Sequence, residues 1–244
     1  MNIVVTGSST GIGRALAESL LAQGHSVWGV ARSDQGELVA RHGGAFRASR
    51  CDVAEWDQVQ RVATEVAAAW PHLDGLVTCA ALHGEVGHAM AVDPRGWSAT
   101  LRANLDGTYY AVRAFYAQLL QAPRRAKVVC FSGGGATKAR PYFSAYAAAK
   151  SGMVRLVETI AEEARGQPID LNSVSPGIVI TRLTEEVLAL GPAVAGEADH
   201  RAATLQRAAG DAPMNQAVGL VEWLLSPASD GVSGQLLSAI PAPA

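Results

Sequence analysis

The stretch Asn2-Ile3-Val4-Val5-Thr6-Gly7-Ser8-Ser9-Thr10-Gly11-Ile12-Gly13 stands at the start of the chain and predicts its fold. The apolar residues before Gly7 indicate a short buried strand, and the helical apolar spacing that follows ends at Gly24. Glycines between a strand and a helix let the backbone approach a pyrophosphate, and the helix N-terminus offers it free N–H groups. An ordinary glycine-rich connection is the alternative. The residues expected to bind a nucleotide here are Gly7, Ser9, Thr10, Gly11, Ile12 and Gly13.

The same strand–helix alternation continues along the chain. Further strands are predicted at residues 26–31, 46–51, 74–80, 127–131, 169–175 and 235–238, and helices at 55–70, 95–121, 146–165 and 216–225. Strands that alternate with helices at this spacing predict an α/β, Rossmann-type doubly wound parallel sheet of about seven strands, with helices on both faces. We expect a single domain over residues 1–244, with a polar, helix-prone insert at about 181–213.

Composition excludes several functional classes. Of 244 residues, 49% are apolar and 17% charged, and the net charge is −2, so bulk electrostatics favours neither nucleic acid nor an anionic membrane as partner. We find no apolar run of the ~18 residues that a membrane span needs and no signal peptide. Cys51, Cys79 and Cys130 lack metal-ligand spacing. We therefore expect a cytoplasmic protein with reduced thiols and no metal site.

Tyr146-Ala147-Ala148-Ala149-Lys150 carries the candidate proton chemistry. Residues four apart share one face of a helix, so the phenol and the ammonium are expected to lie together. A neighbouring cation favours phenolate, so we expect the pKa of Tyr146 to be lowered from about 10 toward neutrality, where it can exchange protons. A half-exposed tyrosine and a solvated lysine on a surface helix are the alternative.

The end of the second predicted strand bears on cofactor choice. Ala31 stands where NAD sites tend to place an acid, and Arg32, suited to a 2′-phosphate, follows it. Asp34 is a competing ribose ligand, although residues 34–37 also look like a capped helix start. NADP(H) is favoured and NAD(H) is possible.

Together these features resemble the short-chain dehydrogenase/reductase superfamily in its single-domain form, over about residues 2–238. The motifs that carry the resemblance are Thr6-Gly7-x-x-x-Gly11-Ile12-Gly13, Cys51-Asp52-Val53, Asn104-Leu105-x-Gly107, Tyr146-x-x-x-Lys150 and Pro176-Gly177 with Thr181. The resemblance implies an NADP(H)-dependent oxidoreductase that moves a hydride between the nicotinamide and a carbonyl or secondary alcohol of a small molecule. It also implies a homotetramer or homodimer through helices around residues 95–121 and 145–166.

The resemblance assigns roles to individual residues. Tyr146 is the expected acid–base group, and Lys150 is expected to hold the nicotinamide ribose. Asn104 is expected to hold a water in a proton relay, although an asparagine that caps or bends a helix is equally consistent. The remaining residues that the resemblance places beside the cofactor are Asp52, Val53, Cys79, Ala80, Pro176, Gly177 and Thr181.

The chain departs from the family pattern in its third catalytic group. The family commonly has a serine thirteen residues before the tyrosine, and here that position is Gly133. Ser132 stands one residue early, which on a regular strand points it to the opposite face. Ser132, or backbone N–H groups of residues 133–135, are the candidate replacements. Thr78-Cys79-Ala80-Ala81 also replaces Asn-Asn-Ala-Gly, and Ser238-Ala239-Ile240-Pro241 replaces the usual Asp-Gly-Gly.

Two functional hypotheses remain open. The first is the active oxidoreductase, and the second is a catalytically impaired cofactor-binding or structural partner subunit, because Gly133 replaces the serine. Basic side chains around the insert suit an anionic substrate, or else form a solvated surface; they are Lys138, Arg140, Arg182, His200, Arg201 and Arg207. His83 and His88 are expected to lie at the surface. The sequence does not name a substrate.

Overall fold

The computed structural model describes residues 1–208 and 210–240. Its seven strands form one parallel sheet in the order β3-β2-β1-β4-β5-β6-β7. The strands are β1 Asn2–Thr6, β2 Ser26–Ala31, β3 Phe46–Arg50, β4 Gly75–Thr78, β5 Ala126–Phe131, β6 Ile169–Ser175 and β7 Leu236–Ser238. The order reverses between β1 and β4, so the crevice expected at a topological switch point lies between their carboxyl ends. The predicted fold class is confirmed.

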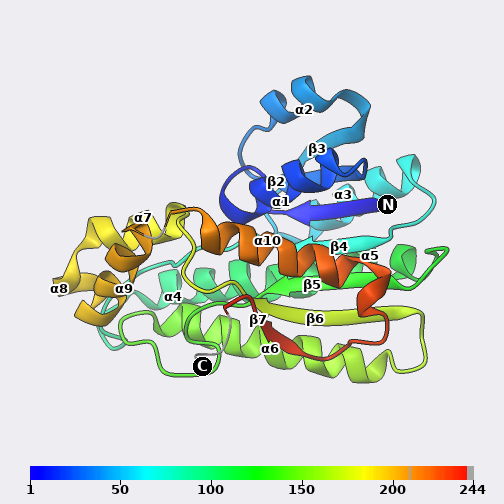
Figure 1. Cartoon of the computed structure of the whole chain (residues 1–244). Coiled ribbons are helices and arrows are strands. Elements are labelled where there is room, and N and C mark those ends of the chain that lie inside the picture. Colours follow the sequence, from blue (N-terminus) through cyan, green and yellow to red (C-terminus); the bar gives the residue numbers. More distant parts are fainter. Residues whose placement is uncertain (209, 241–244) are drawn as a thin grey trace.

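Helices cover both faces of the sheet because its central strands are apolar on both sides. They are α1 Gly11–Ala22, α2 Gly36–His42, α3 Trp56–Ala69, α4 Pro94–Leu101, α5 Gly107–Leu119, α6 Ser144–Glu163, α7 Arg182–Leu190, α8 Pro192–Ala195, α9 Glu197–Ala208 and α10 Ala212–Leu225. Residues Val128 and Cys130 of β5 pack with α3, α5 and α6, whereas Val129 and Phe131 pack with α1 and α10. Figure 1 shows α10 running along the sheet on the side of α1.

Some predicted boundaries are wrong in detail. The helix predicted at residues 95–121 is divided by a π-helical turn, Arg102–Asp106, between α4 and α5. The strand predicted at 74–80 is limited to β4 and ends at Thr78. The capped start predicted at residues 34–37 is not formed by Asp34, since α2 begins at Gly36 after Gln35. In each case the apolar pattern predicts that the element exists, whereas local hydrogen bonding determines where it begins and ends.

The insert forms α7, α8 and α9, which lie beyond the carboxyl end of the sheet (Figure 1). Its apolar side chains Val187, Ala195 and Ala203 form a small core with Phe143 and Tyr146. The insert therefore packs against the start of α6, where the predicted acid–base residue lies. None of the helices in the described ranges is long and apolar enough to cross a bilayer.

Candidate active site

One cavity of about 800 Å³ lies at the carboxyl edge of the sheet, and all but one of the residues predicted from the sequence line it. It runs from the glycine loop after β1, past the ends of β4, β5 and β6, to α7 and α9. The predicted residues that line it are Gly7, Ser9, Thr10, Gly11, Ile12, Gly13, Arg32, Asp52, Val53, Cys79, Ala80, Ser132, Tyr146, Lys150, Pro176, Gly177 and Thr181. Asn104 is the exception, because it lies beneath the lining.

The glycine loop fits a dinucleotide phosphate. Gly7 has a φ of 71°, and a Cβ there would lie 2.6 Å from the Ala80 nitrogen, so a side chain is excluded. A Cβ at Gly13 would lie 2.4 Å from the Gly7 oxygen, which explains the close approach of α1 to the loop. Within the described residues, the Thr10 side chain makes no capping bond and the first turn of α1 carries no acid. Its N-terminal amides are thus free to bind an anion.

The far end of the cavity holds Arg32 and Asp52. Arg32 Nη1 lies 3.7 Å from Asp52 Oδ2, and the Arg32 side chain is 58% exposed. Asp52 is fixed in turn, because its Oδ1 accepts from the Ala54 N–H at 3.0 Å. Asp34 lies outside this cavity, in a neighbouring depression lined also by Gln35 and Gly36. Of the two competing side chains, Arg32 is therefore the one beside the cofactor cleft.

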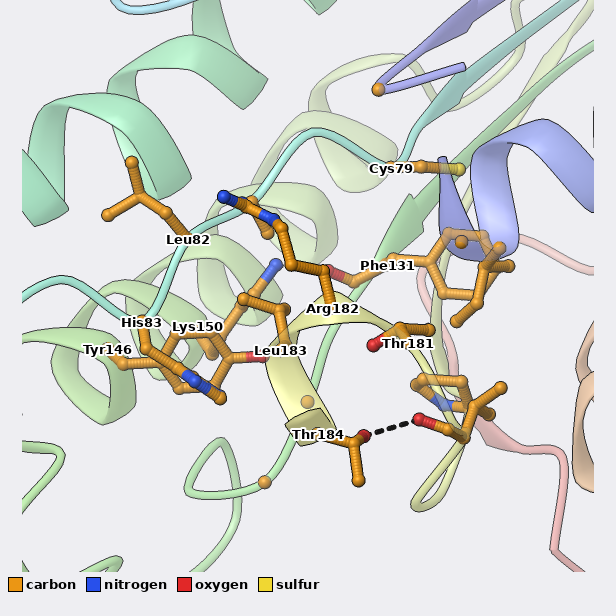
Figure 2. Close-up of a pocket in the computed structure, with 18 of the residues that line it drawn as sticks. Cys79, Leu82, His83, Phe131, Tyr146, Lys150, Thr181, Arg182, Leu183 and Thr184 are labelled. Atoms are coloured by element: carbon orange, nitrogen blue, oxygen red, sulfur yellow. Dashed lines mark hydrogen bonds between the residues drawn. The ribbon is translucent and has the colours of Figure 1, made fainter. Parts of the chain in front are cut away.

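Tyr146 and Lys150 project from α6 into the same cavity (Figure 2). The Tyr146 side chain is 6% exposed, and Lys150 Nζ donates a 2.6 Å hydrogen bond to the Phe131 carbonyl at the end of β5. Burial lowers the pKa of Lys150 to about 8. The Phe131 carbonyl thus holds the Lys150 ammonium between the predicted cofactor site and the Tyr146 phenol.

The expected lowering of the Tyr146 pKa by Lys150 is wrong. Burial raises the pKa of Tyr146 above its ordinary value, and the Arg140 guanidinium acts against that rise. Lys150 Nζ lies 5.7 Å from the Tyr146 ring centroid, whereas Arg140 Cζ lies 5.2 Å from it. The phenol is consequently protonated at neutral pH, which suits a group that gives a proton to a developing alkoxide.

Asn104 supports the site from the π-helical turn. Its side-chain nitrogen donates to the Leu82 carbonyl at 2.8 Å and the Thr100 carbonyl at 2.9 Å, and its Oδ1 accepts from the Leu82 N–H at 3.2 Å. The side chain is fully buried. Asn104 therefore holds the segment after β4 against the helix, and its place in a water relay stays a prediction.

Gly133 occupies the position from which a side chain would meet the phenol. A Cβ built at Gly133 would lie 2.3 Å from Tyr146 Oη. Ser132 is 3% exposed, its N–H donates to the Val174 carbonyl at 2.8 Å, and its hydroxyl has no partner among the described residues. Ser132 lines the same cavity as Tyr146, and its part as a replacement donor stays a prediction.

The prediction for His83 is wrong, and Arg140 is the basic residue that reaches the site. His83 was expected at the surface, but it is 5% exposed, lines the cavity and lies 5.0 Å, centroid to centroid, from the Tyr146 ring. Arg140 stacks over Phe143 at 3.8 Å and bonds Asp199 of α9 at 2.8 Å. The position of His83 just past β4, at the edge where Tyr146 lies, was the available signal. His88 is exposed, as expected.

The other basic residues do not form an anion site. Arg182 lines the cavity but lies 3.5 Å from Glu186, and Arg207 is exposed and lies 3.4 Å from Glu185. Lys138 lines the cavity on an exposed loop, and Arg201 is exposed. The convergent cation is therefore Arg140, and Asp199 already neutralises it.

The cysteines take no part in this chemistry. All three are free, and burial raises the pKa of Cys51 and Cys130 to about 11. Cys79 lines the cavity, and burial raises its pKa still further. Thiols held in the neutral form are poor nucleophiles. Among the residues described, no three His, Cys, Asp or Glu side chains are grouped as metal ligands.

Known proteins resemble this chain in sequence and fold. A family profile described as enoyl-(acyl carrier protein) reductase matches residues 7–239. D-threitol dehydrogenase of Mycolicibacterium smegmatis is 34% identical over 185 residues, which are 74% of this chain and 70% of that protein. The 3-oxoacyl-[acyl-carrier-protein] reductase of Escherichia coli is 27% identical over 183 residues, 74% of each protein.

Solved structures agree on the fold. A short-chain dehydrogenase/reductase of Saccharomyces cerevisiae matches with a TM-score of 0.88 at 23% identity, covering 98% of this chain and 96% of that one. The aldohexose dehydrogenase of Thermoplasma acidophilum matches with a TM-score of 0.83 at 23% identity, covering 100% and 95%. This chain belongs to the short-chain dehydrogenase/reductase family and is an NAD(P)-dependent oxidoreductase that acts on a C–OH or C=O group.

Proposed function

We propose that this enzyme is an NADP(H)-dependent oxidoreductase for the carbonyl or secondary alcohol of a small molecule, with Tyr146 as its acid–base group. The observation that carries the proposal is the placement of Tyr146 and Lys150 in one cavity with the glycine loop. The nicotinamide, when bound, donates or accepts the hydride. The named relatives, a D-threitol dehydrogenase and a 3-oxoacyl-[acyl-carrier-protein] reductase, fit this reaction class.

Different residues of the chain are proposed to bind the cofactor and to transfer the proton. The loop Gly7–Gly13 and the amides at the start of α1 would hold the pyrophosphate, and Lys150 the nicotinamide ribose. Tyr146 gives its proton to the substrate oxygen in reduction and takes it back in oxidation. Burial keeps the phenol protonated, which is the form that gives a proton in reduction.

The preference for NADP(H) rests on Arg32. Its guanidinium lies at the end of β2 beside the cavity, whereas the carboxylate of Asp34 lies outside it. A guanidinium binds a 2′-phosphate through charge-assisted hydrogen bonds that a ribose hydroxyl does not offer. We expect tighter binding of NADPH than of NADH in a fluorescence titration, and equal affinities would contradict this part of the proposal.

A turnover screen tests the function. NADPH oxidation and NADP⁺ reduction are followed over ketones and alcohols, including sugars, polyols and acidic compounds, with wild-type enzyme and Tyr146→Phe. We expect turnover by the wild type and none by the variant, with NADPH affinity unchanged. An active Tyr146→Phe enzyme would refute the mechanism. Wild-type protein that binds NADPH but turns over nothing would favour an impaired subunit that has lost activity at Gly133.

We also propose that the enzyme forms a homotetramer or homodimer through α4, α5 and α6. These helices form one outer surface of the molecule, on which Tyr109 of α5 is 43% exposed. An exposed aromatic residue is typical of an interface anchor. Sedimentation analysis of wild type and Tyr109→Glu would test the assembly, and a monomeric wild type would contradict it.

A further inference from the structure

The absence of a side chain at Gly133 leaves the proposed reaction without the hydroxyl that usually polarises the substrate oxygen. His83 packs directly against the Tyr146 ring, as does the Arg140 guanidinium. Its ring meets Tyr146 edge-on at 5.0 Å and Phe143 at 5.0 Å, which fixes its plane. Figure 2 shows the imidazole lying across Tyr146 within the cavity.

Arg140 determines which nitrogen of His83 carries the proton. Arg140 Nη1 lies 3.5 Å from His83 Nε2. A guanidinium only donates hydrogen bonds, so this contact, at the outer limit of hydrogen-bond distance, favours Nε2 as the acceptor. The proton of a neutral imidazole is then on Nδ1.

The Nδ1–H group is buried and has no hydrogen-bond partner among the described residues. The nearest carboxylate oxygen, Glu186 Oε2 of α7, lies 3.6 Å away, beyond hydrogen-bond range. A buried donor without a partner is unfavourable, so a ligand that accepts a hydrogen bond from it is favoured. His83 lines the cavity, with its ring centroid 5.0 Å from that of Tyr146 and its Nδ1 3.6 Å from Glu186 of α7.

The surroundings keep this imidazole neutral. Burial, followed by Arg140, Arg182 and Lys150, lowers the pKa of His83 to about 3. Glu186 is the acid nearest the ring, and Asp199 is occupied by Arg140. At neutral pH, His83 can therefore donate a hydrogen bond but does not exchange protons.

We propose that His83 Nδ1–H donates a hydrogen bond to the substrate carbonyl oxygen and so replaces the side chain missing at Gly133. The inference rests on the proposed function and names the second donor of the same site. The proton that ends on the product oxygen comes from Tyr146, and His83 keeps its own. A neutral donor of this kind stabilises the developing alkoxide without competing as an acid.

Ser132 is the rival donor, because its buried hydroxyl also has no partner among the described residues. However, the Ser132 N–H donates to the Val174 carbonyl, as in the β5–β6 pairing. A Cβ built on the neighbouring Gly133 would point at the Tyr146 phenol. Because side chains alternate along an extended chain, we expect the Ser132 side chain to point away from Tyr146. Ser132→Ala is included in the test to compare the two donors.

Kinetics with 2,3-butanedione and NADPH test the proposal. The amide nitrogen of asparagine approximates Nδ1 of histidine, so His83→Asn retains the donor that His83→Leu removes. We expect His83→Leu to lower kcat by about 10²–10³, while His83→Asn recovers most of that loss and NADPH affinity is unchanged in both. His88→Leu, at an exposed histidine of the same loop, should behave as wild type. Wild-type kcat in His83→Leu, or an equal loss in Ser132→Ala and none in His83→Leu, would overturn the proposal.

A second measurement does not depend on turnover. In ¹⁵N-histidine-labelled protein, the signal missing from His83→Leu should report a neutral Nδ1–H tautomer at every pH from 5 to 8. An Nε2–H tautomer, or titration near pH 6.5, would overturn the inference. Activity in the Tyr146→Phe enzyme would refute the proposed function itself. If Tyr146→Phe is inactive and His83→Leu keeps wild-type kcat, only the role of His83 as donor is refuted. If wild type does not reduce 2,3-butanedione, the NMR result decides the form of His83.

Discussion

A single methyl group at Gly133 should displace the phenol of Tyr146. An ideal Cβ there would lie 2.3 Å from Tyr146 Oη, about 1.1 Å short of the 3.4 Å at which ordinary contacts begin. The phenol cannot yield freely, since it is 6% exposed and its ring packs against His83 and Arg140. A misplacement of about 1 Å commonly costs about 10² in rate, or about 2.7 kcal/mol of transition-state stabilisation. We therefore expect Gly133→Ala to lower kcat about 100-fold.

The assay is NADPH oxidation with a carbonyl substrate found in the turnover screen, together with NADPH affinity from fluorescence. The affinity should be unchanged, because the clash is with Tyr146 and not with the glycine loop. Gly134→Ala is the matched control: its Cβ would meet nothing closer than Arg140 Cδ at 3.6 Å, and we expect it to keep most of the activity. Gly133→Ser should also fall below wild type, because its Cβ meets the same clash. A fully active Gly133→Ala enzyme would refute the reasoning.

Three further results are expected. Arg32→Ala should weaken NADPH binding about 10- to 100-fold, as loss of a charged hydrogen bond does, and leave NADH unchanged by fluorescence titration; equal losses would argue against 2′-phosphate binding. Burial lowers the pKa of Lys150 from 10.5 to about 8 in the folded state, so the unfolded chain binds more protons above pH 8. In urea unfolding, wild type should therefore gain stability relative to Lys150→Met between pH 8 and 9.5. A stability difference that does not change with pH would contradict the lowered pKa. Lys127 and Asp170 form a buried pair at 2.8 Å, and Asp170 also accepts from Arg125 and from the Gly231 N–H, both at 3.1 Å. Lys127→Met should cost about 3 kcal/mol of unfolding free energy with kcat unchanged. A loss below about 1 kcal/mol would mean that these two other donors satisfy the carboxylate.

The sheet and the cofactor loop were predictable because they depend on local pattern. Buried strands appear in the sequence as apolar runs. The glycines at Gly7–Gly13 mark a tight turn between a strand and the N-terminus of a helix, which is the setting of a phosphate-binding loop. The reversal of strand order brings Tyr146 and the loop to one edge, a consequence of topology that the alternation already implies. The π-helical turn at Arg102–Asp106 was not predictable from period alone, since one inserted residue leaves the apolar spacing nearly intact.

The electrostatics of the site could not be predicted from spacing. Four residues along a helix place Tyr146 and Lys150 on one face, but the distance between phenol and ammonium depends on the side-chain rotamers and on the Phe131 carbonyl. Burial of His83 depends on the insert, whose Val187, Ala195 and Ala203 pack back on α6 from far along the chain. Desolvation then lowers the pKa of His83 together with the surrounding cations, and raises the pKa of Tyr146 against the effect of Arg140.

The packing of the insert also bears on the substrate. Asp199 of α9 bonds Arg140 at 2.8 Å, and Glu186 of α7 lies 3.5 Å from Arg182. An anionic substrate would have to displace a carboxylate already in contact with its cation, and so gain little net charge attraction. A neutral carbonyl oxygen needs only hydrogen-bond donors, and the protonated phenol of Tyr146 supplies one without disturbing either ion pair. The charge arrangement therefore favours a neutral substrate over the anionic one that the run of basic residues suggested.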